Sequence, residues 1–250
     1  MTIFFSTLEN LDKSFPLFSL PHIIPLFIIM IATYIIIINR KKFENYKIKR
    51  IFMITIAILM LISQGLITYW YSISSIGFLK DGLPLYLCRI TSLCIIYSFL
   101  TNTRHLNFII FFIGSLGSTL ALIIPDTSGY LFPHIMYMQF FIIHGCMFLT
   151  IIFLLFIEHY RPDKIELKKI IYFIFSYSLI VSIVNRIVKG NYGYLETPPV
   201  SASFFEILPA GIIYKLGFTT FICLVMFFIY FIFKKPSYNL KSKFIFSSNN

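Results

Sequence analysis

The sequence predicts an all-α polytopic membrane protein, with seven transmembrane helices in one bundle. Of its 250 residues, 58% are hydrophobic and only 12% are charged, and the mean hydropathy is +0.85. A soluble domain of this length does not need so much apolar surface. Apolar stretches of about 20 residues, the length that crosses roughly 30 Å of hydrocarbon, recur seven times. Because the stretches do not alternate between polar and apolar residues, we expect helices rather than barrel strands.

In chain order, the predicted spans cover 21–39, 51–71, 83–101, 106–125, 134–158, 169–188 and 211–233. The fourth span is interrupted by Gly114 and Gly117, and the sixth by Asn185 and Arg186. The N-terminus, MTIFFSTLENLDKSF, lacks the basic, apolar and small-residue order of a cleaved signal peptide. Repeats and low-complexity linkers are also absent from the sequence. We therefore expect residues 1–250 to form a single seven-helix transmembrane domain.

The distribution of positive charge predicts the orientation of the bundle. The chain has 21 basic and 10 acidic residues, which gives a net charge of +11. Fifteen of the 21 fall on one side: Arg40, Lys41, Lys42, Lys47, Lys49, Arg50, Arg104, Arg161, Lys164, Lys168, Lys169, Lys234, Lys235, Lys241 and Lys243. The positive-inside rule makes this side cytoplasmic. We therefore expect a multi-pass protein of the plasma membrane whose N-terminus is outside the cell and whose C-terminus is in the cytoplasm. The basicity favours anionic lipid headgroups and does not indicate a nucleic-acid partner.

Polar residues cluster in the predicted outer half of the bundle. Arg89, His144 and Arg186 lie on three different spans, and Asp126 and Glu206 lie near the same level. An ionisable side chain at membrane depth costs about 2.5–3.5 kcal/mol unless it finds a partner or water. The pattern favours a shared polar cavity that faces the outer leaflet. The alternative is that Arg89 extends to the lipid headgroups and His144 bonds to a neighbouring helix.

Cys88 is the candidate for chemistry. Pro84 suits the first turn of a helix, which puts Cys88 in the second turn, near the positive end of the helix dipole and beside Arg89. Both influences favour the thiolate. A histidine can make a thiol a practical nucleophile, and His134 and His144 are both eligible. The alternative is that Cys88 is a small buried hydrophobe, as the other three cysteines are expected to be.

No metal or other cofactor is expected. The four cysteines are not spaced as zinc ligands, and none lies in a loop where a disulfide framework would be expected. His134 and His144 are ten residues apart, so they do not stack on one helical face as ligands four residues apart would.

Several short motifs occur together in a recognisable order. They are Leu83-Pro-Leu-Tyr-Leu-Cys-Arg-Ile90, Ile124-Pro-Asp126, Phe132-Pro-His134, Gln139-Phe-Phe-Ile-Ile-His-Gly145, Tyr160-Arg-Pro162, Asn191-Tyr-Gly-Tyr-Leu195 and Thr197-Pro-Pro199. In this order and spacing the chain resembles the YwaF-like integral membrane proteins of Gram-positive bacteria and mollicutes, which are grouped with the transmembrane protein 164 family of animals. The resemblance runs from about the second span to the end and includes His22 in the first span.

The resemblance implies a seven-helix acyltransferase-like fold. In the animal branch, a membrane cysteine and a histidine are held to carry fatty-acyl transfer between phospholipids. They match Cys88 in the LPLxLC motif and His144 in the HG motif. The family often has a histidine two residues before the cysteine, where this chain has Tyr86, which can hydrogen-bond but is a poor base near neutral pH.

Together these observations give the hypothesis of a Cys88 thioester formed from a membrane phospholipid, with His144 as base and then acid. The acceptor would be a lysophospholipid or a lipoprotein amine. The residues expected to bind substrate are Arg89, Tyr86, His134, Tyr137, Asn185, Arg186 and Asn191, with the two arginines on the lipid phosphate and the two asparagines as candidate oxyanion donors. Asp126 or Glu206 would orient His144 or pair with Arg89.

Two other classes of function remain open from the sequence. A non-enzymatic transporter or lipid- or anion-binding protein would keep Arg89 and Arg186 in the same polar cavity but would not need a thiol. A packing or assembly subunit predicts instead that Arg89, His144 and Arg186 do not converge.

Overall fold

The computed structural model describes residues 3–7, 15–74, 76–199, 205 and 207–235, and within these ranges every regular element is a helix. This confirms the prediction of an all-α protein. Glu206, one of the two candidate orienting acids, lies outside the described residues.

The described part of the chain contains seven α-helices. They are α1 (Leu20–Ile38), α2 (Tyr46–Ile73), α3 (Leu87–Thr101), α4 (Asn107–Ile123), α5 (Ile135–Phe156), α6 (Lys164–Val188) and α7 (Ile212–Phe233). Three short 3-10 helices, η1 (Ile3–Phe5), η2 (Arg40–Glu44) and η4 (Tyr192–Tyr194), and a π-helical turn, η3 (Phe78–Gly82), lie between or before them.

Five of the helices, α1, α2, α5, α6 and α7, are long and apolar enough to cross a membrane. The other two are shorter than the roughly 20 residues that a perpendicular span needs: α3 has 15 residues and α4 has 17. The prediction that the third span starts at residue 83 is wrong, because α3 begins only at Leu87. Pro84 therefore precedes the helix, and Cys88 lies in the first turn rather than the second.

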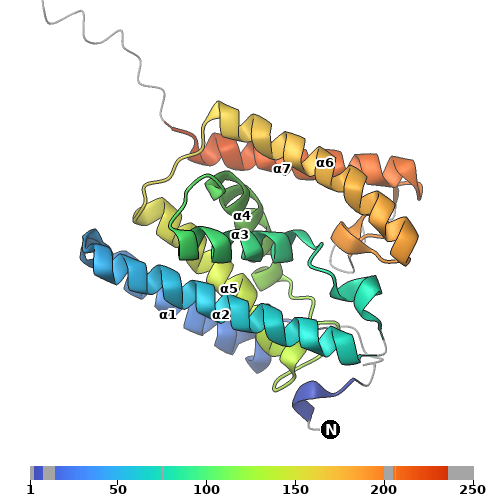
Figure 1. The fold of residues 1–250 in the computed structure, drawn as a ribbon, viewed down its shortest axis with the longest axis horizontal. Helices are drawn as coiled ribbons and strands as arrows, with labels where there is room; N and C mark the ends of the chain where they lie inside the picture. The colour runs from blue at the N-terminus through green and yellow to red at the C-terminus, as the bar shows by residue number, and fades with distance from the viewer. Residues whose placement is uncertain (1–2, 8–14, 75, 200–204, 206, 236–250) are drawn as a thin grey trace, which may run out of the picture.

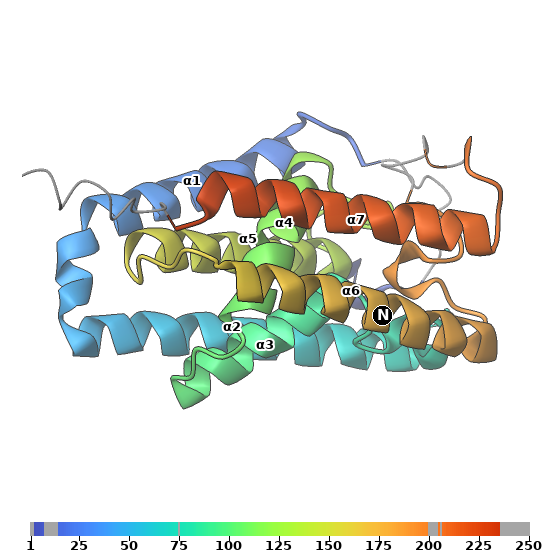
Figure 2. The ribbon, with the colours of Figure 1, turned by 90° about the horizontal axis from the view of Figure 1, so that it is seen from above.

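The helices form three layers (Figure 1). In this view α6 and α7 run along the top, α1 and α2 run along the bottom, and α3, α4 and α5 lie between them. Seen from above, the long helices run roughly along one direction (Figure 2). The middle helix α4 contacts α3, α5, α6 and α7, and its Phe111 and Phe112 are fully buried. By contrast, α1 packs mainly on α5 and leaves most of its side chains exposed, as expected for a lipid-facing helix.

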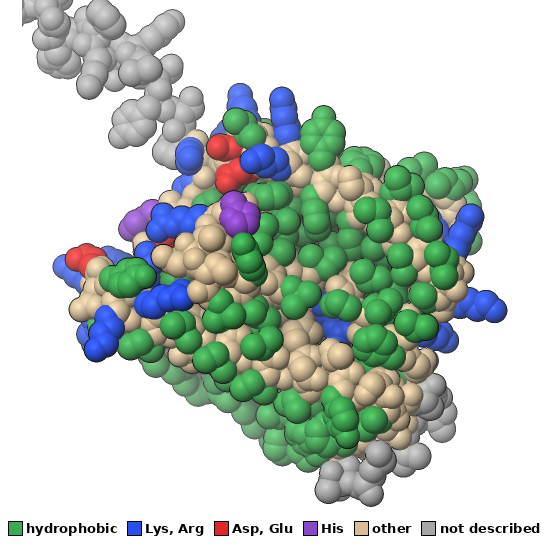
Figure 3. Space-filling view, in the orientation of Figure 1, with side chains coloured by type: hydrophobic (Ala, Val, Ile, Leu, Met, Phe, Trp, Pro, Cys, Tyr) green, Lys and Arg blue, Asp and Glu red, His purple; other side chains and the backbone are tan. Residues whose placement is uncertain are grey.

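One end of the bundle carries most of the positive charge. Lys and Arg side chains gather at the left of Figure 3, where the α1–α2 and α5–α6 turns lie, and hydrophobic side chains cover the band beside them. We call the end formed by residues 39–45, 102–106 and 157–163 the basic end. Its helices begin at ordinary caps: the Asn45 side chain accepts from Lys47 N (2.9 Å), and Asp163 and Glu166 form a capping box.

Candidate functional site

The chain between α2 and α3 folds back into the bundle. The Arg50 guanidinium donates to the carbonyls of Phe99 and Leu100, so the last turn of α3 lies beside the start of α2. From this common level, at 1.5 Å per residue, α2 extends about 15 Å further than α3 does. Residues 76–86 therefore turn back inward before α3 begins. We call the end that contains residues 76–86 and 189–199 the re-entrant end.

Tyrosine hydroxyls replace helical hydrogen bonds along this segment. Tyr192 Oη accepts from Leu83 N (2.9 Å) and donates to Leu79 O (3.1 Å), and Tyr177 Oη donates to Leu85 O (2.7 Å). Non-helical backbone is tolerated at membrane depth only where protein or a water-filled cavity satisfies it. These phenols explain why α3 starts late: the backbone at Leu83 and Tyr86 is extended, and Leu83 N and Leu85 O are bonded to tyrosine hydroxyls.

A second segment folds back against the first. After α6 ends, the Asn185 side chain accepts from Tyr192 N (2.9 Å) and donates to Tyr192 O (3.0 Å). Gly193 has φ +66°, and a Cβ there would lie 2.4 Å from Tyr177 Oη. Tyr194 also has a left-handed backbone (φ 55°), and its carbonyl accepts from Tyr214 Oη (2.6 Å). Positive φ at a non-glycine residue costs free energy and is found where the surroundings enforce it.

Arg89 lies beneath these two segments with one nitrogen unsatisfied. Its side chain is 8% exposed, and Nη1 donates to Gly82 O (2.7 Å) and Leu83 O (3.2 Å). The guanidinium carbon lies 5.4 Å from the centre of the Tyr71 ring. Nη2 is buried and has no hydrogen-bond partner among the residues that the structure describes. A buried guanidinium nitrogen without a partner is costly, so this position suits an anionic ligand atom.

Cys88 precedes Arg89, in the first turn of α3. It is partly buried, and the phenols of Tyr71, Tyr177 and Tyr194 are within electrostatic reach of its sulfur. The backbone N–H groups of Cys88 and Arg89 interact with the Cys88 sulfur at the start of the helix, where the dipole favours a negative charge.

Tyr86 closes one side of the same cluster. Its hydroxyl donates to Asp81 Oδ1 (2.6 Å), and its ring packs against the rings of Tyr192 (5.3 Å between centroids) and Tyr194 (5.7 Å). Asp81, Tyr71, Tyr177, Tyr192 and Tyr194 were not among the predicted site residues. The spacing of Tyr177, Val181 and Asn185 along one face of α6 could have indicated that Tyr177 points inward, because all three are buried.

His144 lies on α5 and is 7% exposed. Its Nδ1 is 2.8 Å from the Phe140 carbonyl, which can only accept, so Nδ1 carries the hydrogen and Nε2 keeps a free lone pair. Within the described residues, no hydrogen bond joins His144 to Cys88 or to an acid.

The helices that carry Cys88 and His144, α3 and α5, both approach Gly114 of α4. A Cβ at Gly114 would lie 3.1 Å from Ile151 on α5 and 3.7 Å from Thr91 on α3, so the three helices meet there. From this junction, Cys88 lies one turn toward the re-entrant end on α3, and His144 lies two turns toward the same end on α5. Both groups thus lie on the same side of the junction.

Two other predicted binding residues hold the protein together. His134 caps α5, with Nδ1 accepting from Met136 N (3.1 Å) and Nε2 2.8 Å from Ser6 O, and its ring stacks on Tyr130 at 3.9 Å. Tyr137 Oη donates to Pro21 O (2.6 Å) and so ties α5 to α1. Their polar atoms are therefore used within the fold.

The remaining predicted residues lie near the re-entrant end but do not converge on Arg89. Asn191 is bonded through its amide to the backbone of Glu196 and Thr197. Arg186 is exposed on α6, and Asp126 is exposed and accepts from Ser128 N (3.1 Å). In the described part of the chain, no group of three or more His, Cys, Asp or Glu side chains is arranged to hold a metal ion.

The fold and this cluster define a multi-pass helical membrane protein in which a thiol and an arginine lie under two re-entrant segments. The model of the TMEM164 family matches residues 17–230, and the chain belongs to that family. This confirms the resemblance to the transmembrane protein 164 family. No curated protein and no solved structure matches the chain.

Proposed function

We propose that the protein is a membrane-embedded acyltransferase. It moves a fatty acyl group from a phospholipid through a thioester on Cys88 to a lysophospholipid or to another lipid or lipoprotein acceptor. The observation that carries this proposal is the position of Cys88 in the first turn of α3, next in sequence to Arg89, whose buried Nη2 has no hydrogen-bond partner among the described residues. Membership of the TMEM164 family supports a membrane protein of that class.

The chemistry consists of two acyl exchanges. The Cys88 thiol gives its proton to His144 Nε2, and the sulfur attacks the ester carbonyl of the phospholipid. The bond from the carbonyl carbon to the glycerol oxygen breaks, and the leaving oxygen takes the proton from His144. In the second half, His144 removes the proton of the acceptor hydroxyl or amine, which attacks the thioester. The C–S bond then breaks and the sulfur recovers the proton, so no redox partner or cofactor is needed.

His144 and Arg89 have separate roles in this scheme. The hydrogen bond from Nδ1 to the Phe140 carbonyl leaves Nε2 of His144 in the basic form. Hydrogen bonds between catalytic groups often tighten only in the substrate complex, and we propose that Cys88 and His144 approach across α4 when the lipid is bound. Nη2 of Arg89 would bind a phosphate oxygen of the donor.

We further propose the topology that the charges predict. All seven helices cross the plasma membrane, the basic end faces the cytoplasm, and the re-entrant end opens to the outer leaflet. The short α3 fits this arrangement, because the segment 76–86 covers the depth that α3 does not reach.

The test is to trap the thioester. Purified protein in nanodiscs is incubated with a phospholipid that carries an alkyne-tagged acyl chain. The amount of tagged acyl chain that hydroxylamine releases from the protein is then measured. Cys88→Ser should reduce such label by about 1,000-fold, and His144→Gln by about 100-fold. Cys94→Ser is the matched control, because Cys94 lies on the same helix and is also partly buried.

If wild type and Cys88→Ser label equally, or if the label maps to Cys94, the thioester proposal is wrong. A second candidate function is a non-catalytic carrier or binder of an anionic lipid, which the missing hydrogen bond between Cys88 and His144 favours. Such a protein would bind lipid equally well after Cys88→Ser and lose binding after Arg89→Gln.

A further inference from the structure

The basic end contains a hollow that the proposed activity does not use. It lies between η2 and the last turn of α5 and has a volume of about 380 Å³. Its lining residues are Arg40, Lys41, Phe43, Glu44, Tyr46, Lys49, Phe156, Ile157 and His159. Along α2, Lys49 and Tyr71 are about 33 Å apart at 1.5 Å per residue, so this hollow is far from Arg89 and Cys88.

The walls of the hollow are held in place by packing. The Phe43 ring packs on Phe52 (5.6 Å between centroids) and on Phe153 (6.1 Å), which fixes η2 against α2 and α5. On the other side, α5 ends at Phe156, His159 three residues later has a left-handed backbone (φ 51°), and Tyr160 N donates back to Leu154 O (2.8 Å). The hollow therefore exists without a ligand to organise it.

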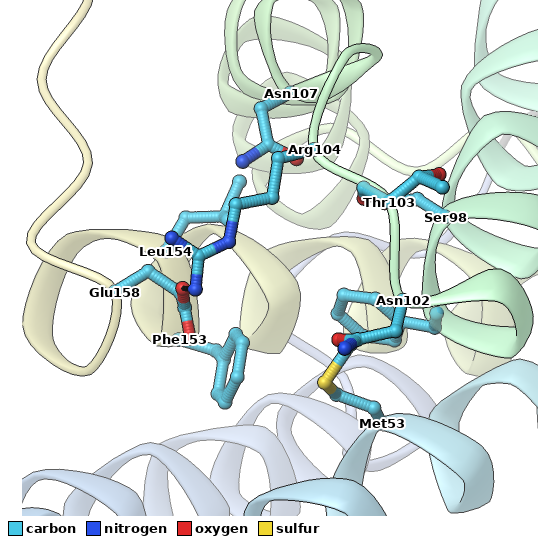
Figure 4. A pocket seen from close by; sticks show the side chains of 10 residues that line it. Met53, Ser98, Asn102, Thr103, Arg104, Asn107, Phe153, Leu154 and Glu158 are labelled. Atoms are coloured by element: carbon cyan, nitrogen blue, oxygen red, sulfur yellow. Dashed lines mark hydrogen bonds and ion pairs between the residues drawn. The ribbon is translucent and has the colours of Figure 1, made fainter.

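The charges around the hollow favour an anion. Three basic side chains and one acidic side chain line it. Lys49 is paired with Glu158, which also contacts Arg104 (2.6 Å; Figure 4). Arg40 and Lys41 are exposed, and neither side chain forms an ion pair or a hydrogen bond among the residues described. Two cationic groups are thus free to meet a ligand.

The same hollow also has apolar surface that a small soluble anion would not use. Phe156 is 41% exposed and lies in its wall. Beside it, Ile38 at the end of α1 is 61% exposed and Tyr46 at the start of α2 is 65% exposed. Cationic groups at the rim with apolar surface next to them match a lipid, whose phosphate lies at the interface and whose chains run along the helices.

We propose that this hollow binds the headgroup of an anionic phospholipid at the basic end of the bundle. Arg40 and Lys41 hold the phosphodiester, and the acyl chains lie along the exposed apolar side chains of α1 and Phe156. This site is separate from the lipid that would react at Cys88, and it does not depend on acyl transfer.

The test measures lipid binding to the full chain by native mass spectrometry. The protein in detergent is titrated with phosphatidylglycerol or phosphatidylcholine that carry the same acyl chains. The double variant Arg40→Gln/Lys41→Gln should bind phosphatidylglycerol about 30-fold more weakly than wild type does, since each basic side chain near an anionic headgroup contributes about fivefold. Arg40→Lys/Lys41→Arg, which keeps both charges, should bind as wild type does.

The matched control is Lys164→Gln/Lys168→Gln, which removes two exposed charges from α6 at the same end. It should stay within about twofold of wild type. Three results would overturn the proposal: an equal loss in the control, equal binding of phosphatidylcholine, or displacement of phosphatidylglycerol by millimolar inorganic phosphate. The last result would make the hollow a site for a free anion.

Discussion

The two ends of the bundle are built on different principles. At the basic end, α2 and α6 begin at caps made by residues near them in sequence, the Asn45 side chain for α2 and the Asp163 and Glu166 box for α6. At the re-entrant end, the backbone is satisfied by side chains far away in sequence: Tyr192 bonds to Leu79 and Leu83, more than 100 residues before it.

The difference explains where a site can form. Locally capped turns leave no backbone group inside the bundle, because each helix runs to the surface before it ends. A helix that starts inside the bundle brings free N–H groups, a dipole and its first side chains to membrane depth. Cys88 and Arg89 occupy this position on α3, and Arg89 keeps one nitrogen unsatisfied there.

The largest expected effect comes from crowding the contact between Gly193, in the second re-entrant segment, and Tyr177 on α6. Gly193→Ala puts a Cβ 2.4 Å from Tyr177 Oη at a left-handed backbone position. Because Tyr177 is held by its bond to Leu85, it cannot move away freely. Strained φ and overpacking together should cost about 3 kcal/mol. The midpoint of thermal unfolding in detergent measures this loss.

Gly65→Ala is the control for this prediction. Gly65 lies within α2, and a Cβ there would meet nothing within 4 Å. The exchange should leave stability unchanged or raise it by about 0.5–1 kcal/mol, as in an ordinary helix. Equal stability of the two variants would mean that Gly193 does not pack against Tyr177 on α6 as described.

The next effect tests the side chain that folds the second segment back. Asn185→Ala removes both hydrogen bonds to the buried backbone of Tyr192 and should cost about 2 kcal/mol. Asn39→Ala, at the basic end, removes an exposed bond to Ile35 O and should cost less than about 0.5 kcal/mol. Thermal unfolding of both variants compares the two ends directly, and a larger loss at Asn39 would reverse the comparison.

The same contrast explains what the sequence could predict. Hydrophobic stretches and charged turns predict the helices, because each depends on residues that are close in sequence. The start of α3 was placed four residues too early, since Pro84 and the apolar run 83–87 suit a helix and nothing local indicates the bonds from Tyr177 and Tyr192. Those bonds depend on how distant helices pack.

The site residues follow the same rule. Cys88 and Arg89 stand out because a thiol and a guanidinium are unusual beside an apolar run. Tyr71, Tyr177 and Tyr194 do not, because tyrosine is common at the ends of membrane helices and only the fold brings these three toward Cys88. His134 and Tyr137 were expected to bind substrate, but their polar atoms bond to Ser6 and Pro21.

A smaller effect should follow from removing one phenol. Tyr177→Phe leaves the Leu85 carbonyl without its 2.7 Å partner and should cost about 1.5 kcal/mol. Because this bond lies just before α3, the rate at which Cys88 reacts with a membrane-permeant maleimide should also change. Tyr172→Phe is the control, since Tyr172 lies on the same helix and is 73% exposed. A maleimide rate that stays at the wild-type value in Tyr177→Phe would contradict the role of this bond in holding the start of α3.

The smallest expected effect is at the basic end and has a different dependence on salt. Glu158→Gln removes the charge that Lys49 and Arg104 share and should cost about 1 kcal/mol, most of it from Lys49, because Arg104 is 72% exposed. In 1 M salt the deficit should shrink, since ions screen charges near the surface. The deficit of Asn185→Ala should stay constant, because its bonds are buried and uncharged. If salt reduces the stability deficits of Glu158→Gln and Asn185→Ala equally, the two ends are not stabilised by different kinds of interaction.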